Sequence, residues 1–477
     1  MSLSGYYRKG FLTNMKSATK STPLEKLAAN VLETRFENFD QSTIENAKAR
    51  LIDTMGCLIG GANAPGNSEL IGLVRDWGGK EEATILIHGG KAPAHNAAMV
   101  NSIMARSFDF EPVSPLVGGT SMPGHISGTT VMTAMAMGEA KDINGKELIT
   151  ALVVGDDVAS RVLAASGFGF NLGWDCTGTV NAFGATAIAG RLLGLNRVQM
   201  RNAFGIVLNQ LAGSLQTIWD GTAAFKLCQG ISARNGIVSA QLAGTGWTGP
   251  KDALFNSFGY YRLYTEGCHN PAILTKDLGK NYYSDATFKP YPCCRITHSA
   301  IDCALALVGK HNIKAQDIKE VTVYVSSDGL NHICGYPFQI GDFPQVNAAF
   351  SYQYTVATAL MRKSVRPEHF SEQYIHASQT KALIKKIKLT ELPGANLYQA
   401  RIKVTMKDGS EVTESNNAPK GDSLRNPMAK DEIINKFWAN VDFSHTVTRE
   451  KAGKLLSLLE KLEYIDSVSK IVPLLVV

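Results

Sequence analysis

Apolar residues at helical spacing dominate the first half of the chain. Thr22 followed by Pro23 and Glu25 is a typical helix start, and apolar residues then follow at intervals of three and four. The same periodicity predicts further helices over residues 42–59, 68–77, 94–107, 125–140, 145–166, 177–193, 197–216 and 230–243, and a short strand over residues 83–87. We therefore expect a large all-helical body, in which many Ala and Gly residues let helices approach closely.

The pattern changes after Thr275. Alternating apolar residues predict a strand over 319–325, and residues 346–360 have the spacing of a helix. Residues 398–405 and 411–415 flank Lys407-Asp408-Gly409, which is typical of a β-hairpin. Helical patterns return over 426–441 and 449–463.

This order predicts a mainly α protein with an α/β lid. Residues 1–275 and 415–477 would form one large discontinuous helical domain, with residues 1–21 as a loose tail, and residues 276–414 would form the smaller α+β lid domain.

Composition excludes several classes of protein. The net charge of +6 is scattered without a basic stripe, which argues against nucleic acid as a partner. No apolar run approaches the length of about 20 residues that spans a membrane. The eight cysteines are dispersed without a CxxC pair, as expected of reduced thiols in a cytoplasmic protein. We therefore expect a site with no metal and no cofactor.

The stretch 289–298 carries the strongest indication of a binding site. Pro290 and Pro292 impose extended backbone, so the chain must turn before the helix predicted over 299–308. Arg295 and His298 then lie at a helix start, where free N–H groups and the helix dipole favour an anion such as a carboxylate. Tyr291 is a further candidate for substrate binding. The alternative is that His298 only caps or packs the helix.

A second candidate is the irregular loop between Asp109 and His125. An acid and a histidine at its two ends suit a general base, with Asp109 orienting or charging His125. The alternative is a structural turn built on Gly118-Gly119, with His125 as a cap. Phosphate binding is less favoured, because no glycine-rich phosphate motif is present.

Two other helix starts carry polar residues. Asp175 precedes a predicted helix, where capping alone explains it. Lys226 lies between Phe225 and Leu227, an apolar setting that makes it a candidate for binding a carboxylate rather than an ordinary surface charge. Together these residues suit proton removal next to a carboxylate of a small anionic metabolite. No nucleophile motif such as GxSxG is present.

The order of these motifs resembles the MmgE/PrpD family over nearly the whole chain from about Leu24. The motifs are S-F-D-F-E and P-G-H-I-S within 107–127, G-W-D-C-T at 173–177, K-L-C-Q-G-I-S-A-R-N-G at 226–236, K-P-Y-P-C-C-R-I-T-H-S-A-I-D at 289–302, A-A-F-S-Y-Q-Y-T-V-A at 348–357 and N-P-M-A-K-D-E at 426–432. The family includes 2-methylcitrate dehydratase, cis-aconitate decarboxylase and iminodisuccinate epimerase. The resemblance implies a homodimer with a metal-free site in the cleft between its helical domain and lid.

The resemblance also implies roles for single residues. Asp109 matches the first acid of the family's D-F-D-D motif, His125 the histidine of H-P-S, and His298 the histidine that follows P-C-C, so all three are expected to be catalytic. Two positions depart from the pattern. Asp175 stands where dehydratases and decarboxylases usually carry a histidine, and Lys226 is displaced by one position from the family's lysine.

Three functions remain open on these grounds. The first is a cofactor-independent lyase or dehydratase that takes a proton alpha to a carboxylate of a di- or tricarboxylic acid, as 2-methylcitrate dehydratase does, with a reaction like that of cis-aconitate decarboxylase as an alternative. In it Lys226 and Arg295 would hold carboxylates. The second is a racemase or epimerase of an amino- or imino-dicarboxylate, with Asp175 binding the amine. The third is a helical scaffold without activity.

Overall fold

The computed structural model of the chain describes residues 21–477, so all but the last residue of the predicted loose tail lies outside the described residues. The first described helix is α1 (Pro23–Glu33). Its start is the predicted one, because the Thr22 hydroxyl accepts the N–H of Glu25 and the Glu25 carboxylate accepts the N–H of Thr22 at 2.9 Å.

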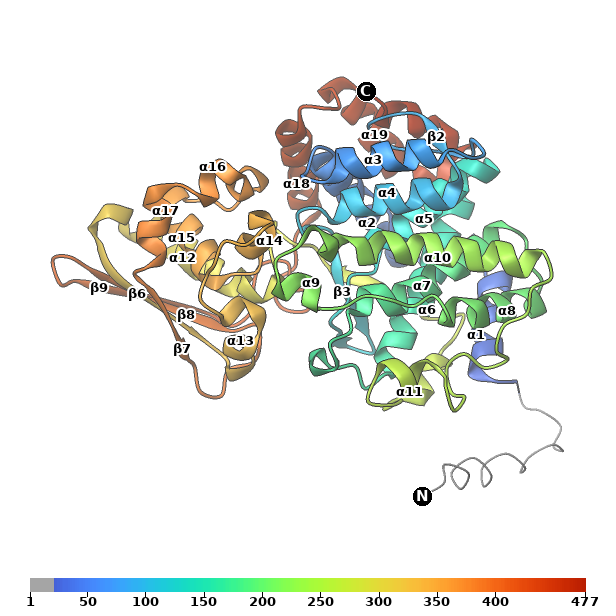
Figure 1. Cartoon of the computed structure of the whole chain (residues 1–477), viewed down its shortest axis with the longest axis horizontal. Coiled ribbons are helices and arrows are strands. Elements are labelled where there is room, and N and C mark those ends of the chain that lie inside the picture. The colour runs from blue at the N-terminus through green and yellow to red at the C-terminus, as the bar shows by residue number, and fades with distance from the viewer. Residues whose placement is uncertain (1–20) are drawn as a thin grey trace, which may run out of the picture.

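Most of the described chain is a body of packed helices (Figure 1). Its longer helices before residue 245 are α2 (Gln41–Gly61), α3 (Asn67–Trp77), α4 (Ala94–Arg106), α5 (Ser127–Lys141), α6 (Gly145–Ala165), α7 (Cys176–Leu192), α8 (Arg197–Leu208) and α10 (Leu227–Gly244). Helix α10 packs against both α7 and α4. The contact with α7 is so close that a Cβ at Gly236 would lie 2.5 Å from the Cβ of Ala185, so glycine is required there.

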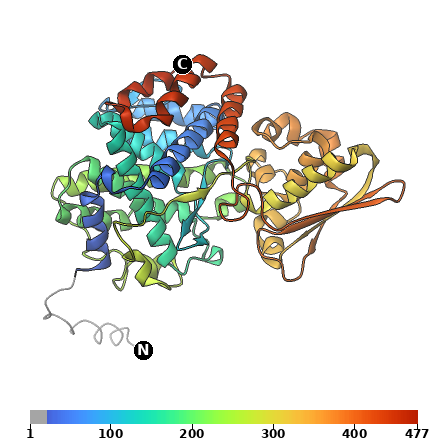
Figure 2. The ribbon, with the colours of Figure 1, turned by 180° about the vertical axis from the view of Figure 1, so that it is seen from behind.

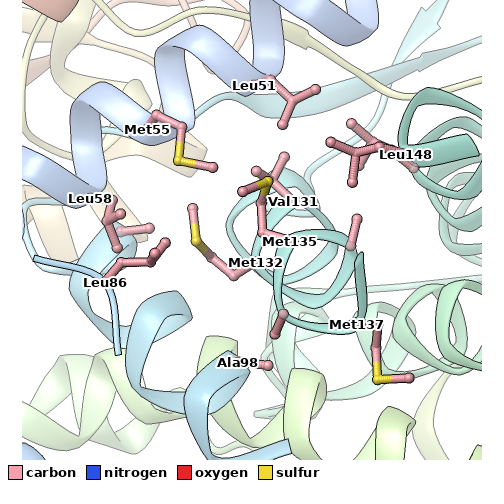
Figure 3. Packing of buried hydrophobic residues seen from close by; sticks show 14 of the residues in the cluster. Leu51, Met55, Leu58, Leu86, Ala98, Val131, Met132, Met135, Met137 and Leu148 are labelled. Carbon is pink, nitrogen blue, oxygen red and sulfur yellow. The ribbon is translucent and has the colours of Figure 1, made fainter. Parts of the chain in front are cut away.

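Helices from the two ends of the chain share one core. The C-terminal helices α18 (Lys430–Ser444) and α19 (Arg449–Glu460) pack on α2, and Figure 1 shows them beside α2, α3 and α4. Figure 3 shows the centre of this core, where Leu51, Met55 and Leu58 of α2 face Met132 and Met135 of α5. The buried ammonium group of Lys436 on α18 contacts Asp53 of α2 at 2.8 Å, so an ion pair joins this C-terminal helix to an N-terminal one.

A smaller α/β unit has its own hydrophobic core and lies to one side of the helices (Figures 1 and 2). Its sheet has the strand order β7-β6-β8-β9, and only the β6–β7 pair is parallel. The strands are β6 (Ile318–Val325), β7 (Ile387–Glu391), β8 (Ala400–Met406) and β9 (Glu411–Asn416). Helices of the unit are α12 (His298–His311), α13 (Ser327–Asn331), α14 (Pro344–Ala349), α15 (Tyr352–Arg362), α16 (Glu372–Ile375) and α17 (Ser378–Ile384).

The predicted mainly α chain with a smaller α/β region is therefore confirmed. The domain boundaries at 275 and 414 stay a prediction. Within residues 21–477, no helix combines the length and the apolar character needed to cross a membrane.

Several predicted elements differ in extent. The helix predicted over 346–360 is two helices, because Ser351 is extended and its hydroxyl caps α15 by accepting the N–H of Tyr354. The helix predicted from 197 ends at Leu208 instead of continuing to 216. The helix predicted from 426 begins at Lys430, where the Glu432 side chain accepts the N–H of Ala429. The strand predicted over 83–87 is reduced to β1 (Ala83–Thr84), which pairs with β2 (Lys91–Ala92).

A small sheet at the junction joins distant parts of the chain. Strand β3 (Val113–Val117) pairs with β4 (Thr120–Ser121) and with β5 (Asp285–Thr287). From β5, the buried Asp285 carboxylate accepts the N–H groups of Ile126 and Ser127 at 2.9 and 2.7 Å. These bonds occupy the start of α5 and fix the backbone directly after His125. The helix predicted from 125 therefore begins two residues later.

Candidate active site

A cavity of about 500 Å³ lies between the helical body and the α/β unit. Loops of the body line one side, and the other side is lined by residues of the α/β unit, including Arg295, His332 and Tyr398. Three of the predicted site residues meet on its wall, namely His125, Asp175 and Arg295. A second cavity of about 770 Å³ lies against α18 and is lined by Tyr291 but by none of those three. We therefore take the first cavity as the candidate site.

The charged centre of this site is Arg106, at the end of α4. Its side chain is 2% exposed, and its Nη1 lies 2.6 Å from Oδ1 of Asp109 and 2.6 Å from Oε1 of Glu111, while also contacting Nδ1 of His125. Burial by itself lowers the pKa of Arg106, but the two carboxylates outweigh it, so the guanidinium stays charged. Behind it, Lys289 binds both the carbonyl oxygen and Oδ2 of Asp109, at 2.6 and 2.7 Å.

His125 is held in place by this charged group. Its Nδ1 lies 3.1 Å from Oε1 of Glu111 and 3.9 Å from Oδ1 of Asp109, so Glu111 rather than the predicted Asp109 is the nearer carboxylate. The backbone oxygen of His125 accepts hydrogen bonds from Asn181 and Gln229, at 2.6 and 3.1 Å. Because Nδ1 faces the charged group, Nε2 is the ring nitrogen left to act on a ligand.

Burial and nearby charges set the protonation states of His125 and Glu111. Burial and the positive charge of Arg106 lower the pKa of His125, and the hydrogen bond with Glu111 only partly opposes them. The imidazole is therefore neutral near pH 7. Burial by itself raises the pKa of Glu111, but the charge of Arg106 and the bond to His125 outweigh it and hold that pKa well below its usual range. The result is an ionised carboxylate beside a neutral imidazole.

Arg295 lines the opposite side of the cavity. Its Nη1 donates to the hydroxyls of Ser114 and Ser121 at 2.7 and 3.2 Å, its Nη2 lies 3.1 Å from Asp422, and its guanidinium stacks 4.2 Å from the ring centre of Tyr398. Arg106 and Arg295 share one further feature. The Nε of each is buried and has no hydrogen-bond partner within residues 21–477. Both guanidinium groups line the cavity, where their positive charges favour an anion.

Asp175 and Lys226 have different surroundings. Asp175 lies on the cavity wall and is the N-cap of α7, with Oδ1 accepting the N–H of Thr177 at 2.9 Å. Lys226 is not among the residues that line the cavity. Its ammonium group donates to the carbonyl of Pro65 at 2.7 Å and to Oδ1 of Asn67 at 2.8 Å, and burial lowers its pKa to about 8.

His298 and Tyr291 lie behind the wall of the cavity. His298 is 1% exposed, and its Nε2 is 3.3 Å from the carbonyl oxygen of Cys293. Its ring packs edge-on against Tyr291 at 5.2 Å, and the Tyr291 hydroxyl donates to Asp302 at 2.7 Å. Burial, with a smaller effect from Lys289, holds the pKa of His298 well below its ordinary value. The structure thus separates His298 from the cavity that His125 lines, since the first residue of α12 turns inward.

Three residues that pattern reasoning did not select belong to the site. Arg106 is the last residue of α4, where a long amphipathic helix normally exposes a basic side chain, and Glu111 follows Asp109 in the same S-F-D-F-E segment. His332 lines the cavity from the α/β unit. Its position could not be inferred from spacing, because it comes from a loop more than 200 residues away from His125.

Two groups of side chains have the atoms to hold a metal ion. One is Asp109, Glu111 and His125, but the guanidinium of Arg106 already contacts all three. The arginine therefore supplies the positive charge that a metal would bring. The other group is Cys294, His332 and Cys334.

Comparison with known proteins agrees with the motifs. The model of the MmgE/PrpD N-terminal domain matches residues 25–271, and that of the MmgE/PrpD C-terminal domain matches residues 291–461. A cis-aconitate decarboxylase from Aspergillus terreus is 24% identical over 427 residues, covering 84% of this chain and 85% of the relative. The cis-aconitate decarboxylase of Mus musculus is 27% identical over 81% of this chain and 79% of the relative, and that of Homo sapiens 26% over 81% and 80%.

Proposed function

Because the chain belongs to the MmgE/PrpD family, we propose that it is a lyase that acts on a small di- or tricarboxylic acid, with His125 moving a proton at the carbon next to a carboxylate. The observation that carries the proposal is that this imidazole and two arginines, one from each side, line the same cavity. Breaking a bond beside a carboxylate builds negative charge on carbon, and preorganised cations in a confined site stabilise that charge.

Each group has a task in this proposal. The guanidinium groups of Arg106 and Arg295, which line the cavity, attract substrate carboxylates. Glu111 orients the imidazole by its contact with Nδ1, so that Nε2 faces the substrate. Asp109, itself bound by Lys289, holds Arg106 from behind. Lys226 is left outside this scheme, since its ammonium group is already bonded to Pro65 and Asn67.

Two lyase reactions fit the site, and the direction of proton transfer separates them. In decarboxylation the bond to a carboxylate breaks, carbon dioxide leaves and the electron pair stays on carbon. Because the imidazole is neutral near pH 7, His125 must first take up a proton from water and then donates it to that carbon. In dehydration neutral His125 accepts the proton next to the carboxylate, and hydroxide leaves as water after taking a second proton from solvent. We favour decarboxylation of a cis-aconitate-like tricarboxylate, because relatives that carry this name match over four fifths of the chain.

The test is a substrate panel followed by NMR in heavy water. Cis-aconitate, 2-methylcitrate and other di- and tricarboxylates are incubated with wild type, with His125→Gln, and with His376→Gln as a control. His376 is exposed, does not line the cavity, and its Nε2 lies 3.0 Å from Glu372 of the preceding helix α16. We expect conversion of one tricarboxylate, a loss of at least about 100-fold in kcat/KM for His125→Gln, and no loss for the control. Wild-type turnover by His125→Gln would refute the proposal.

The second candidate is an isomerase of an amino- or imino-dicarboxylate. The observation that favours it is Asp175 on the cavity wall, where a carboxylate would repel a tricarboxylate but bind an amine. An isomerase would exchange solvent deuterium into its substrate without releasing water or carbon dioxide. Asp175→Asn would abolish that exchange, whereas it would leave a lyase active on a tricarboxylate.

Two further properties stay predictions. The resemblance implies a homodimer, which light scattering on the purified chain tests. The dispersed cysteines suggest a cytoplasmic protein.

A further inference from the structure

The candidate site continues into a further cavity across apolar side chains. Ile218, Trp219, Ile333 and Phe350 line both the candidate site and a cavity of about 300 Å³, so the two cavities adjoin at these residues, which we call the apolar wall. Two of the four residues belong to α9 (Gln216–Trp219), on the side of the helical body that faces the α/β unit in Figure 1. The other two belong to the α/β unit.

The further cavity suits an uncharged group rather than a carboxylate. Within residues 21–477, no lysine, arginine or histidine lines it, whereas Asp220 does. A carboxylate there would lose water without gaining a cation, which is unfavourable. Tyr336 and Phe338 line this cavity, and the ring of Tyr336 packs edge-on against Trp219 with 5.0 Å between ring centres. An alkyl chain would leave water for apolar surface there, which is favourable.

Contacts between the two units hold the apolar wall in place. The ring of Phe350 packs edge-on against Phe225 of the body, with 6.2 Å between ring centres. Just after α9, a Cβ at Gly221 would lie 2.1 Å from Nδ2 of Asn347, so glycine is required for this close approach. Trp219 is still 42% exposed, and a ligand that covered it would gain by burying that surface.

The volume leaves room for such a ligand. A tricarboxylate of the size of cis-aconitate has about a dozen non-hydrogen atoms, and at about 30 Å³ each, the share of a water molecule in the liquid, it fills at most about 360 Å³. The candidate site has about 500 Å³, and the further cavity adds about 300 Å³. At the same volume per atom, the candidate site alone has space for about four more carbons.

We infer that the substrate carries an alkyl chain beside its carboxylates and that the apolar wall binds this chain. The inference rests on the lyase site proposed above and names its substrate class, an alkyl-substituted di- or tricarboxylic acid. The carboxylates lie toward Arg106 and Arg295 and the reacting carbon beside His125, while the chain follows the apolar wall toward the further cavity. Trp219 and Ile333 then select the substrate without taking part in the chemistry.

The first test measures binding and does not depend on turnover. Methyl-, propyl- and pentylsuccinate lack the double bond of cis-aconitate and the hydroxyl of 2-methylcitrate, so they serve as unreactive ligands for calorimetry with the full chain. We expect the affinity to rise about fourfold with each added methylene, the gain from burying one such group. A chain of equal length that ends in a carboxylate should lose most of this gain, since the described lining of the further cavity holds no cation.

Substitutions assign the gain to the apolar wall. Trp219→Ala and Ile333→Ser should each reduce it to below about twofold per methylene, because the chain then buries less apolar surface. The two residues come from different units, so the test stands even if one substitution disturbs the fold. Trp247→Ala is the matched control and should keep the wild-type gain, because Trp247 is 62% exposed and lines neither cavity.

The outcomes separate this inference from the proposed lyase activity. Conversion of cis-aconitate together with equal affinities for all the alkylsuccinates would overturn the inference and leave the activity. A gain per methylene that Trp219→Ala removes, without conversion of any acid in the panel, would overturn the activity and support the alkyl site. Failure to bind pentylsuccinate, or the same gain in wild type, Trp219→Ala and Ile333→Ser, would also overturn the inference.

Discussion

Replacing Glu111 by glutamine tests whether the charged group around Arg106 holds His125. The substitution keeps the shape of the side chain and removes its charge. The carboxylate is fully buried, 2.6 Å from Arg106 and 3.1 Å from His125, so no water can take its place. We expect Glu111→Gln to lose both stability and turnover.

The size of the stability loss follows from the partners that remain. Removing one partner of a buried ion pair costs about 3 to 5 kcal/mol. Asp109 still contacts Arg106 at 2.6 Å, so the guanidinium keeps one counter-charge and we expect about 3 kcal/mol, at the low end of this range. For a helical body of a few hundred residues this corresponds to a drop of about 6 °C in the melting temperature.

The loss should depend on pH with a defined sign. The pKa of Glu111 in the folded protein lies below its usual value of 4.5, so its contribution is fully present above that value. It is lost as pH falls below 4.5 and the folded carboxylate becomes protonated. The difference in melting temperature between wild type and Glu111→Gln should therefore be constant from pH 6 to 8 and shrink below pH 4.5.

The effect on turnover comes through the imidazole. The bond from Glu111 raises the pKa of His125, so its removal should shift the corresponding limb of the kcat/KM profile to lower pH. Loss of orientation should lower kcat/KM by about 100-fold. Glu450→Gln is the control, because Glu450 forms an exposed pair with Lys454 on one helix. If Glu111→Gln melts and turns over like this control, Arg106 and Glu111 do not position His125.

Three further substitutions test other parts of the site. Arg295→Lys keeps the charge but loses the stack on Tyr398 and the Nε donor, so KM should rise about tenfold with little change in kcat. An unchanged KM in steady-state assays would show that Arg295 does not contact the substrate. His298→Ala should cost about 3 kcal/mol of unfolding free energy, because the side chain is buried; if denaturant unfolding shows full stability but turnover is lost, His298 contacts the substrate. Lys226→Met tests the pKa of about 8, which lies below the usual 10.5. The unfolded chain then binds more protons between these values, so wild type should gain about 3 kcal/mol relative to Lys226→Met as pH rises from 8 to 10.5, measured by denaturant unfolding.

Local sequence patterns were sufficient to predict most helices and strands, because the periodicity and caps of each element specify it. Thr22 and Glu25 begin α1 as predicted, and the alternation over 319–325 is the half-buried strand β6. Breaks inside apolar runs were harder to predict. Ser351 interrupts a continuous helical pattern because its hydroxyl caps the next helix. A serine in such a run is otherwise compatible with helix, so its role depends on the neighbouring structure.

Prediction of the candidate site from the sequence met the same limit, because burial and contacts between distant residues decide which side chains reach the cavity. His125, Asp175 and Arg295 could be selected because each lies at a helix start or beside a turn, where polar groups face outward. Arg106 could not be selected in this way. It is buried only because Asp109 and Glu111 compensate its charge, and a helical pattern carries no information on such a contact. His298 is the converse case, since its position at a helix start predicts exposure to a ligand but the preceding turn directs it onto Cys293.

The two ends of the cavity wall therefore differ in how they are built. On the helical side, the imidazole of His125 belongs to a compensated ionic group whose members lie within 20 residues of one another, so it should keep its geometry when the α/β unit moves. On the α/β side, Arg295 and His332 are carried by segments that pack in a second hydrophobic cluster, to which the helical body contributes the buried residues Ile218 and Phe225. A change in the spacing of the two units would alter substrate contacts through Arg295 while leaving the pKa of His125 nearly unchanged. Substitutions at the junction should accordingly change KM before they change the pH profile.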